Sequence, residues 1–293
     1  MARLLIVDGH AYAYRAFYAI RGMTSPTGKP TNAVYGFIKM LAKLRASLQP
    51  SHVVVVWDGG LSAERTTALP GYKAQRPEMP DELGWQIQEL VEYLAAAGLA
   101  SLCRDGVEAD DVIAGLARRA AVAGWDVVVA SSDKDFMQLV SPRIGLVNPS
   151  DKSVKVWGAA EVRAKAGVDP QQVVDWLALV GDAVDNIPGV TGVGPKTAAG
   201  LLNQFGSVTQ LYGQLDAVQS ERLRGALVAA TEIVRRNVEL VRLKEELASD
   251  VSLADLAVRP ERLETLREQY SRWGFRSMLA ELVTAQVAQP VLL

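Results

Sequence analysis

The sequence predicts an open α/β sheet followed by a helical domain. Three short runs rich in valine, isoleucine and leucine read as buried strands: Leu4–Val7, Val53–Trp57 and Val127–Ser131. Their apolarity is continuous and does not alternate, which is typical of a parallel sheet covered on both faces. Helical patterns separate the runs, and this alternation favours an open, mainly parallel sheet with helices on both faces.

The helical patterns follow one another along the chain. They cover 11–20, 33–48, 85–98, 112–124, 221–243 and 261–283. Two weaker runs, Ile144–Val147 and Val154–Trp157, predict an edge hairpin. From about residue 170 onward the periodicity is helical and no convincing strand remains. We therefore expect an α/β core over 1–165 and a helical domain over 166–293.

Composition and length describe a globular chain without a marked charge excess. Its 293 residues carry a net charge of −2, so a surface that binds anions must be local. Cys103 is the only cysteine; it excludes an internal disulfide, indicates a reducing compartment and reads as buried packing. The apolar run before Asp8 is too short for a signal peptide, and no segment approaches the ~18 apolar residues of a membrane span. We expect a cytoplasmic protein with no membrane partner.

Carboxylates stand at the end of each predicted strand. Asp8 follows the first run and Asp58 the second, while Asp133 and Asp135 follow the third. Ligands of open α/β sheets bind beyond the carboxyl ends of the strands, so neighbouring strands would bring these four groups to one edge. Taken singly, an aspartate after a strand is more often a turn or cap residue.

Two further acidic groups lie near predicted helix starts. Glu108, Asp110 and Asp111 open the helical pattern that leads into the third strand. The helix macrodipole favours acids in a first turn, which explains one or two of them. Asp182 and Asp185 lie three residues apart and would share one face of a helical turn, although caps are an equally simple explanation.

The nine carboxylates together predict bound cations. Two carboxylates about 5 Å apart repel by roughly 3 kcal/mol at an effective dielectric near 20, whereas the macrodipole returns only about 0.3–1 kcal/mol per acid. A zinc site of the His/Cys type is poorly supported, because the chain has only His10, His52 and Cys103 to offer. Oxygen ligands suit Mg²⁺ or Mn²⁺. Nine carboxylates are too many for one octahedral ion. We therefore expect two metal ions about 3.5–4 Å apart, the arrangement of sites that catalyse in-line phosphoryl displacement.

A long polar segment, Leu61–Pro80, interrupts the α/β pattern. It is punctuated by proline and glycine and is long for a connection inside a compact domain, which favours a functional role. It carries Tyr72, Lys73 and Arg76. A solvated loop is the alternative, and for an arbitrary segment of this kind it is the more frequent outcome.

Six ordered motifs point to a known family. They are VDGHAYAYRAFYA, NAVYGF, GYKAQRPEMP, GVEADDVIAGLARRA, SSDKDFMQLVS and LVGDAVDNIPGVTGVGPKTAAGLL. In this order they closely resemble the 5′ nuclease domain of bacterial DNA polymerase I, within the flap endonuclease and 5′-3′ exonuclease superfamily. The similarity extends over essentially the whole chain. It implies a PIN-like nuclease core, a helical arch at about 61–82, and metal-dependent cleavage of DNA flaps and 5′ ends.

The resemblance also assigns the site residues. The metal-binding acids of the family match Asp8, Asp58, Glu108, Asp110, Asp111, Asp133, Asp135, Asp182 and Asp185. All nine are acidic here, so an active enzyme with two Mg²⁺ ions, or Mn²⁺ in their place, is expected. Arg15, Lys73 and Arg76 match residues near the scissile phosphate. Tyr72, Lys73 and Arg76 would hold a single strand at the arch through stacking and phosphate contacts.

A glycine-rich stretch at about 186–200 resembles a helix-hairpin-helix turn. Gly192 and Gly194 let the backbone approach a phosphate, and N–H groups at the next helix start can hold it. Lys196 and Thr197 would add contacts that position duplex DNA without reading bases. The spacing approaches a P-loop, but a proline interrupts it and no buried strand precedes it. In the family a K⁺ ion often bridges such a hairpin and a phosphate.

The expected partner is DNA with 5′ flaps, nicks or 5′ ends. It would be bound by a monomer in the bacterial nucleoid, fused or coupled to a DNA polymerase and a ligase in replication and repair. A non-catalytic DNA junction binder is one alternative, against which the full set of acids counts. A hydrolase of small phosphate esters is another; such folds have Asp-x-Asp after the first strand, where this chain has Asp8-Gly9-His10.

Overall fold

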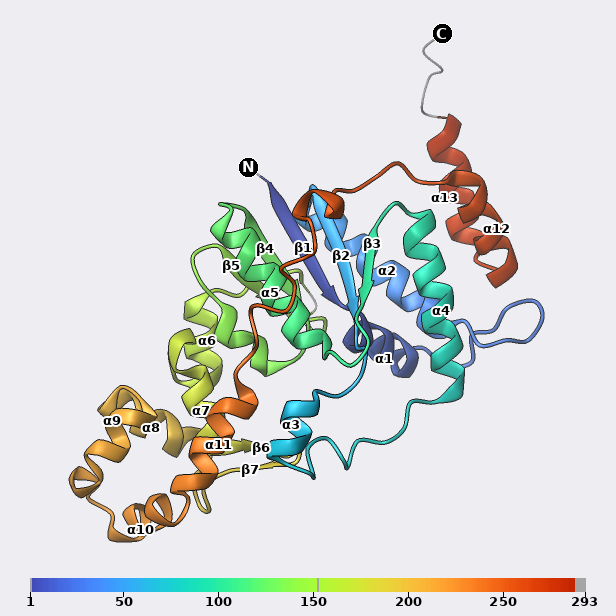
Figure 1. Cartoon of the computed structure of the whole chain (residues 1–293). Coiled ribbons are helices and arrows are strands. Elements are labelled where there is room, and N and C mark those ends of the chain that lie inside the picture. Colours follow the sequence, from blue (N-terminus) through green and yellow to red (C-terminus); the bar gives the residue numbers. More distant parts are fainter. Residues whose placement is uncertain (1, 152, 288–293) are drawn as a thin grey trace.

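The central sheet is parallel throughout, and its middle strands end side by side. A computed structural model of the chain describes residues 2–151 and 153–287 (Figure 1). The strands run in the order β3-β2-β1-β4-β5. They are β1 (Arg3–Asp8), β2 (His52–Trp57), β3 (Ala100–Cys103), β4 (Asp126–Ala130) and β5 (Ile144–Val147). Val7 pairs with Val55 on one side and Ala130 on the other, so β2, β1 and β4 end together.

The three valine-rich runs are confirmed as the three middle strands, and the differences lie at the sheet edges. β3 was not predicted, because Ser101 interrupts its apolarity and an edge strand does not need two apolar faces. Cys103 ends this strand and is exposed, so its expected burial was wrong. The edge hairpin is shorter than predicted: β5 pairs in parallel with β4, and among the described residues its antiparallel pairing with the following run is one bridge, between Leu146 and Trp157.

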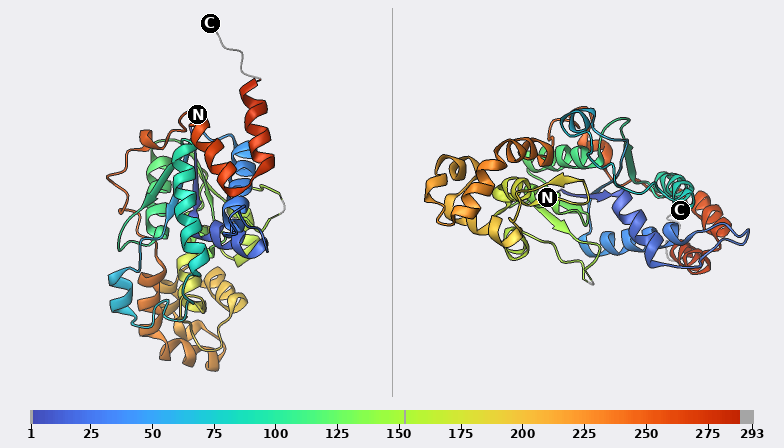
Figure 2. Two further views of the ribbon diagram at one scale, coloured as in Figure 1. Left: turned by 90° about the vertical axis from the view of Figure 1, so that its right-hand side faces the viewer. Right: turned by 90° about the horizontal axis from the view of Figure 1, so that it is seen from below.

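Helices cover both faces of the sheet, as the apolar strands require. Along β1, Leu5 and Val7 pack with one set of helices and Leu4 and Ile6 with the other. The ribbon views show helices on either side of the sheet (Figures 1 and 2). The first face is covered by α1 (Gly9–Ala19), α2 (Asn32–Leu48) and α4 (Asp81–Ala96), and the second by α5 (Ala109–Val122). The α/β class predicted from the sequence is therefore confirmed.

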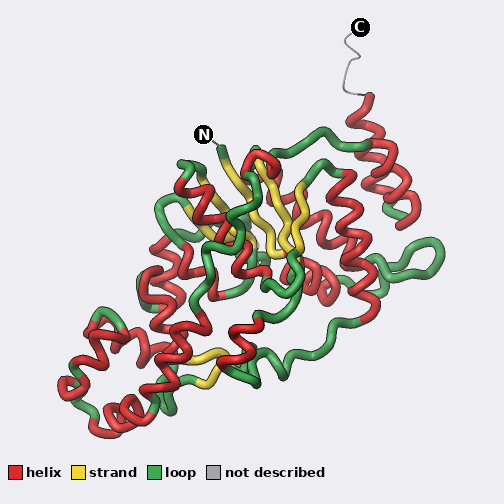
Figure 3. Tube along the Cα trace, in the orientation of Figure 1, coloured by secondary structure: helices red, strands yellow, loops and turns green. Residues whose placement is uncertain are grey.

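The arch predicted at about 61–82 covers the segment between β2 and α4, residues 61–80, and the first two residues of α4. The only regular element of 61–80 is the short helix α3 (Ala63–Ala68), and turns and irregular chain fill the rest (Figure 3). The N–H of Lys73 donates to the carbonyl oxygen of Asp185 at 3.0 Å, which ties the arch to the chain beyond α7. The arch is thus connected at its ends to β2 and α4, and in its middle it is hydrogen-bonded to Asp185.

A helical lobe follows the core. It contains α6 (Ala159–Ala166), α7 (Val173–Val180), α8 (Pro195–Phe205), α9 (Val208–Gly213), α10 (Glu221–Ala229) and α11 (Thr231–Val241). A small antiparallel pair, β6 (Gly181–Asp182) and β7 (Ile187–Pro188), lies between α7 and α8. Short 3₁₀ helices occur at η1 (Lys134–Leu139), η2 (Pro170–Gln172), η3 (Leu215–Ala217) and η4 (Leu253–Leu256).

The last two helices leave this lobe and return to the core. α12 (Leu263–Trp273) packs against α4, and α13 (Arg276–Val287) packs against α12 (Figures 1 and 2). Trp273 and Phe275 are buried in the same cluster as the helices of the first face, where Trp273 contacts Glu89 of α4 and Phe275 contacts Tyr35 of α2. The helices expected to form one domain over 166–293 therefore lie in two places: α6 to α11 form the lobe, and α12 buries its apolar stripe against the core. Within residues 2–151 and 153–287, no helix combines the length and apolarity that crossing a bilayer requires.

Candidate active site

A cavity of about 440 Å³ lies beyond the carboxyl ends of the middle strands. Six of the nine predicted acids line it, namely Asp8, Asp58, Asp110, Asp133, Asp182 and Asp185. His10, Tyr14, Arg76 and Lys134 also line it. The parallel sheet thus brings together carboxylates that lie far apart along the chain, at the edge where such folds bind their ligands.

The strand ends fix the first two carboxylates. Asp8 closes β1 and caps α1: its Oδ1 accepts from the N–H of Ala11 at 3.0 Å, and its Oδ2 accepts from the hydroxyl of Ser131 at 2.7 Å. Asp58 follows β2, and its backbone N–H donates to Nδ1 of His10 at 3.0 Å. His10 therefore joins the loop after β2 to the first turn of α1, which is a structural role.

The turn after β4 holds Asp133 and Asp135. Asp133 caps the 3₁₀ helix η1, and its Oδ1 accepts from the N–H of Asp135 at 2.9 Å. Oδ1 of Asp135 is buried and, among the described residues, has no hydrogen-bond donor. An acceptor that has lost its water and gained no donor is costly, so this oxygen is free for a ligand that the protein itself does not supply.

Asp182 and Asp185 reach the cavity from the small β6–β7 hairpin. The expectation that they share a helical face was wrong, because the four residues from 183 to 186 form a turn. Oδ1 of Asp182 accepts from the N–H of Val184 at 2.9 Å, and Asn186 adopts a positive φ of 57°. Asparagine tolerates this left-handed conformation, which allows the turn to be tight and to present both carboxylates.

Burial and mutual repulsion dominate the electrostatics of the cavity. Burial raises the pKa of Asp8 to about 6, and the charges of Asp133 and Asp58 add to the shift. The pKa of Asp110 is raised well above its usual range by burial and by Asp133. The pKa values of Asp133 and Asp135 are raised by burial and by their acidic neighbours. Each shift disfavours the charged form, so a positive ligand would be stabilising here.

Three cations of the chain partly compensate this charge. Nη2 of Arg76 lies 2.5 Å from Oδ1 of Asp185, and Nζ of Lys134 lies 3.3 Å from Oδ2 of Asp182. Nζ of Lys73 lies 4.0 Å from Oδ2 of Asp110. Lys134 was missed by the sequence analysis, although its place between two candidate ligands in Asp-Lys-Asp could have indicated it.

Glu108 lies behind the cavity and does not line it. Its Oε1 accepts from the N–H of Ser62 at 3.0 Å, and its Oε2 accepts from the hydroxyl of Tyr72 at 3.0 Å and from Nζ of Lys73 at 2.5 Å. Burial alone would raise the pKa of Glu108, but Lys73 and Arg65 outweigh it and the pKa is lowered. Tyr72 is only 4% exposed, so its predicted stacking against a base does not fit this structure.

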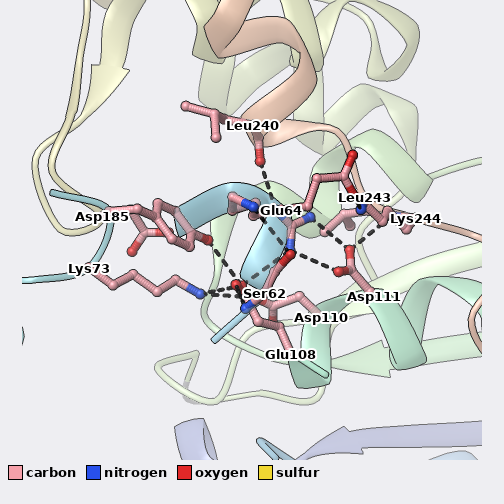
Figure 4. Close-up of polar contacts among 12 residues, drawn as sticks. Ser62, Glu64, Lys73, Glu108, Asp110, Asp111, Asp185, Leu240, Leu243 and Lys244 are labelled. Carbon is pink, nitrogen blue, oxygen red and sulfur yellow. Dashed lines mark hydrogen bonds and ion pairs between the residues drawn. The ribbon is translucent and has the colours of Figure 1, made fainter. Parts of the chain in front are cut away.

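Asp111 also lies outside the cavity, and donors of the protein itself bind its carboxylate. Nη1 and Nη2 of Arg65 each donate to one of its carboxylate oxygens at 2.8 Å. Figure 4 shows Asp111 with dashed lines that reach both of its carboxylate oxygens. Oδ1 accepts in addition from the N–H of Lys244 at 2.9 Å. Both oxygens are therefore occupied by donors. Nothing in the sequence distinguishes Arg65 from the other charged residues of its polar segment.

The remaining predicted residues lie away from the acids. Arg15 is exposed on α1 and donates from Nη1 to the hydroxyl of Ser150 at 3.0 Å. Gly192 adopts a φ of +78°, a conformation that favours glycine, and Gly194 caps the eleven-residue helix α8. Lys196 and Thr197 are exposed in the first turn of α8. This turn offers free N–H groups and a positive side chain together.

Two family models together match most of the chain. One, for the N-terminal resolvase-like domain of 5′-3′ exonucleases, matches residues 3–167. The other, for the 5′-3′ exonuclease C-terminal SAM fold, matches residues 168–264. This chain belongs to the 5′-3′ exonuclease family. Its resemblance to that family, predicted from the six motifs, is thereby confirmed.

Relatives of this exonuclease family differ in length. A 5′-3′ exonuclease of Aquifex aeolicus is 39% identical over 282 residues, which are 96% of each chain. DNA polymerase I of Pseudomonas aeruginosa is 43% identical over 290 residues, and the chain spans only 31% of its length. A bacteriophage T5 flap endonuclease solved with DNA and metal ions superposes with a TM-score of 0.66 at 24% identity, over 96% of this chain and 98% of that one. This last likeness shows a shared fold.

The donor set of this exonuclease fits a hard cation in its chemistry. Every acid of the cavity offers oxygen, and Oδ1 of Asp135, which has no donor among the described residues, is a further buried acceptor on the same turn as Asp133. Across the described ranges, however, no three side chains of the metal-binding types converge closely enough to hold an ion as they lie. Arg76 and Lys134 occupy two of the carboxylates instead. Binding of a cation would therefore require these side chains to exchange partners.

Proposed function

We propose that the chain is a divalent-metal-dependent, structure-specific 5′ nuclease that hydrolyses phosphodiester bonds of DNA near 5′ ends and flaps. The observation that carries this proposal is the group of six carboxylates around one cavity, three of them with raised pKa values. Bound cations would stabilise the charged forms of such a group. The T5 flap endonuclease of the same fold was solved with DNA and metal ions. Two Mg²⁺ ions, or Mn²⁺, are the proposed cofactors.

The acids that would hold these ions are those of the cavity and Asp135, and Glu108 would act from behind them. When bound, the metal pair would supply hydroxide at neutral pH and stabilise the leaving oxygen. The protein's own residues have other tasks. The caps and turns that fix Asp8, Asp133 and Asp182 hold the carboxylates in place. Arg76 and Lys134 are placed to transfer from carboxylates to a phosphate.

Duplex DNA would be held through its phosphates at a distance from the cavity. The turn at Gly192 and Gly194, with Lys196 and Thr197 in the first turn of α8, has the chemistry for such contacts and reads no bases. Arg15 would contact phosphate nearer the cavity. The K⁺ ion at the hairpin, and coupling to a polymerase and a ligase in replication and repair, stay predictions.

The test is a metal-titrated assay on 5′-labelled flap, nicked, gapped and single-stranded DNA. We expect cleavage near the flap base with Mg²⁺ and none with EDTA. Binding of flap DNA without cleavage at any metal concentration would instead indicate a junction binder. Turnover of p-nitrophenyl phosphate without flap cleavage would indicate a hydrolase of small phosphate esters.

Lys73→Ala is expected to slow the chemical step more than it weakens DNA binding. Lys73 lies 2.5 Å from Glu108 and 4.0 Å from Asp110, so its charge acts on the rear of the cavity. Loss of one such group lowers catalytic rates by about 10²-fold. The measurement is single-turnover cleavage with enzyme in excess. Lys165→Ala, an exposed residue of α6, is the control, and an unchanged rate in Lys73→Ala would remove Lys73 from the mechanism.

Lys196→Ala is expected to weaken the binding of duplex-containing DNA to the same degree whatever its sequence. One phosphate contact fewer should reduce the slope of log K against log salt by about one. Fluorescence anisotropy on two flap substrates of unrelated sequence, across a salt series, measures this. A loss confined to one sequence, or an unchanged slope, would contradict a phosphate contact.

A further inference from the structure

A buried ion pair lies at the base of the arch, outside the acidic cavity. Arg65 of α3 is 4% exposed and Asp111 of α5 is 1% exposed. The two terminal nitrogens of Arg65 each donate to one of the two oxygens of Asp111, both at 2.8 Å. Such bidentate pairs are both strong and specific in geometry. Neither residue lines the cavity, so the pair needs another explanation.

The rest of the guanidinium reaches a third element. Its Nε donates to the carbonyl oxygen of Leu240 at 3.0 Å, and Nη2 donates to that of Arg242 at 3.1 Å. Leu240 lies in the last turn of α11, whose final carbonyls need donors, and Arg242 follows directly. One side chain thus joins the start of the arch, the first turn of α5 and the end of a helix in the lobe.

The same guanidinium also touches the group that organises the arch. Nη1 of Arg65 lies 3.2 Å from Oε2 of Glu108, the oxygen that accepts from Tyr72 and Lys73. Oε1 of Glu108 accepts from the N–H of Ser62, the residue that caps α3. The position of the Glu108 side chain therefore depends on Arg65. The position of Lys73 depends on it in turn, because Lys73 bonds to Glu108.

We propose that Arg65 and Asp111 are positioning residues that clamp the base of the arch and orient Glu108 and Lys73 behind the carboxylate cavity. Through Leu240 and Arg242 the clamp also makes the position of the arch depend on α11. Lysine could not replace Arg65, because an ammonium group has three N–H donors and Arg65 donates to four oxygens. The consequence for catalysis rests on the proposed nuclease function; the clamp itself does not.

The test compares Arg65→Gln, Asp111→Asn and the double variant with the wild type. Hydrogen exchange is measured first, on metal-free protein without DNA. We expect the amides of residues 62–76 to exchange at least about tenfold faster in the variants, through local opening, while those of β1, β2 and β4 keep their wild-type rates. The double variant removes both charges together, so it folds even if a single variant, left with one unpaired buried charge, does not.

Kinetics and metal binding then separate positioning from ligation. The EPR signal of free Mn²⁺ measures the midpoint of Mn²⁺ binding. In Asp111→Asn this midpoint should stay within about threefold of wild type, because Asp111 positions other groups and does not bind the ion. In Asp110→Asn it should shift by more than tenfold, because Asp110 lines the cavity. The flap-cleavage kcat should fall by about 10–10²-fold with KM nearly unchanged, because misplaced groups lower the rate more than ground-state binding.

Two results would overturn the proposal. An equal shift of the Mn²⁺ midpoint in both asparagine variants would make Asp111 a metal ligand. Wild-type exchange over residues 62–76 in the double variant would show that the pair does not hold the arch. If the wild-type protein fails to cleave any flap substrate, the nuclease function falls, and the exchange experiment still decides the clamp.

Discussion

Asp8→Asn is expected to lower the single-turnover rate of flap cleavage by at least about 10³-fold, since metal-held charge stabilisation contributes several kcal/mol to such reactions. Asparagine has the shape of aspartate and can still accept from the N–H of Ala11 and bond to Ser131, so the cap of α1 survives. Only the charge is lost. Binding of flap DNA should change little, because the proposed duplex contacts lie at the hairpin before α8.

The same substitution is expected to stabilise the metal-free protein. Burial raises the pKa of Asp8 to about 6, so its charged form is unfavourable in the folded chain at pH 7. The shift corresponds to about 3 kcal/mol, which is several degrees in Tm for a chain of this size. Differential scanning fluorimetry in EDTA measures this. Asp216→Asn, on an exposed residue of η3, is the control. A fall in Tm together with lost activity would indicate simple misfolding.

Metal removal is expected to abolish cleavage and to leave a protein whose stability falls as the pH rises. The folded pKa of Asp8 lies above the unfolded value of 3.8, so folded protein binds more protons between about pH 4 and 6. The stability gained from that proton is fully present below pH 4 and is lost as the pH rises through 6. Asp110, Asp133 and Asp135 shift in the same direction.

Mg²⁺ should therefore raise Tm much more at pH 7.5 than at pH 5, where protons compete for the same carboxylates. At a hundred times its dissociation constant a ligand adds about 2.7 kcal/mol. Thermal scans from pH 5 to 8, with Mg²⁺ or with EDTA, measure the difference. Curves that coincide at pH 7.5 would mean that the acids serve only as caps and turns and hold no ion.

The sequence alone predicted the class of the fold and the family. Continuous valine-rich runs require burial on both faces, which a parallel sheet flanked by helices provides, and six motifs in order are specific to 5′-3′ exonucleases. It also predicted that acids at strand ends would meet, as Asp8, Asp58 and Asp133 do at one cavity. The carboxyl ends of parallel strands lie at the same edge of the sheet, so a residue's position at a strand end is enough to predict that it reaches this edge.

Only the tertiary structure separated acids that the sequence treats alike. Asp110 and Asp111 are adjacent, yet successive residues of a helix point about 100° apart, and one side chain faces the cavity while the other faces Arg65. Arg65 lies 46 residues away in the chain, and periodicity carries no information about such a partner. The burial of Tyr72 and the return of α12 to the core were decided in the same way, by contacts between distant segments.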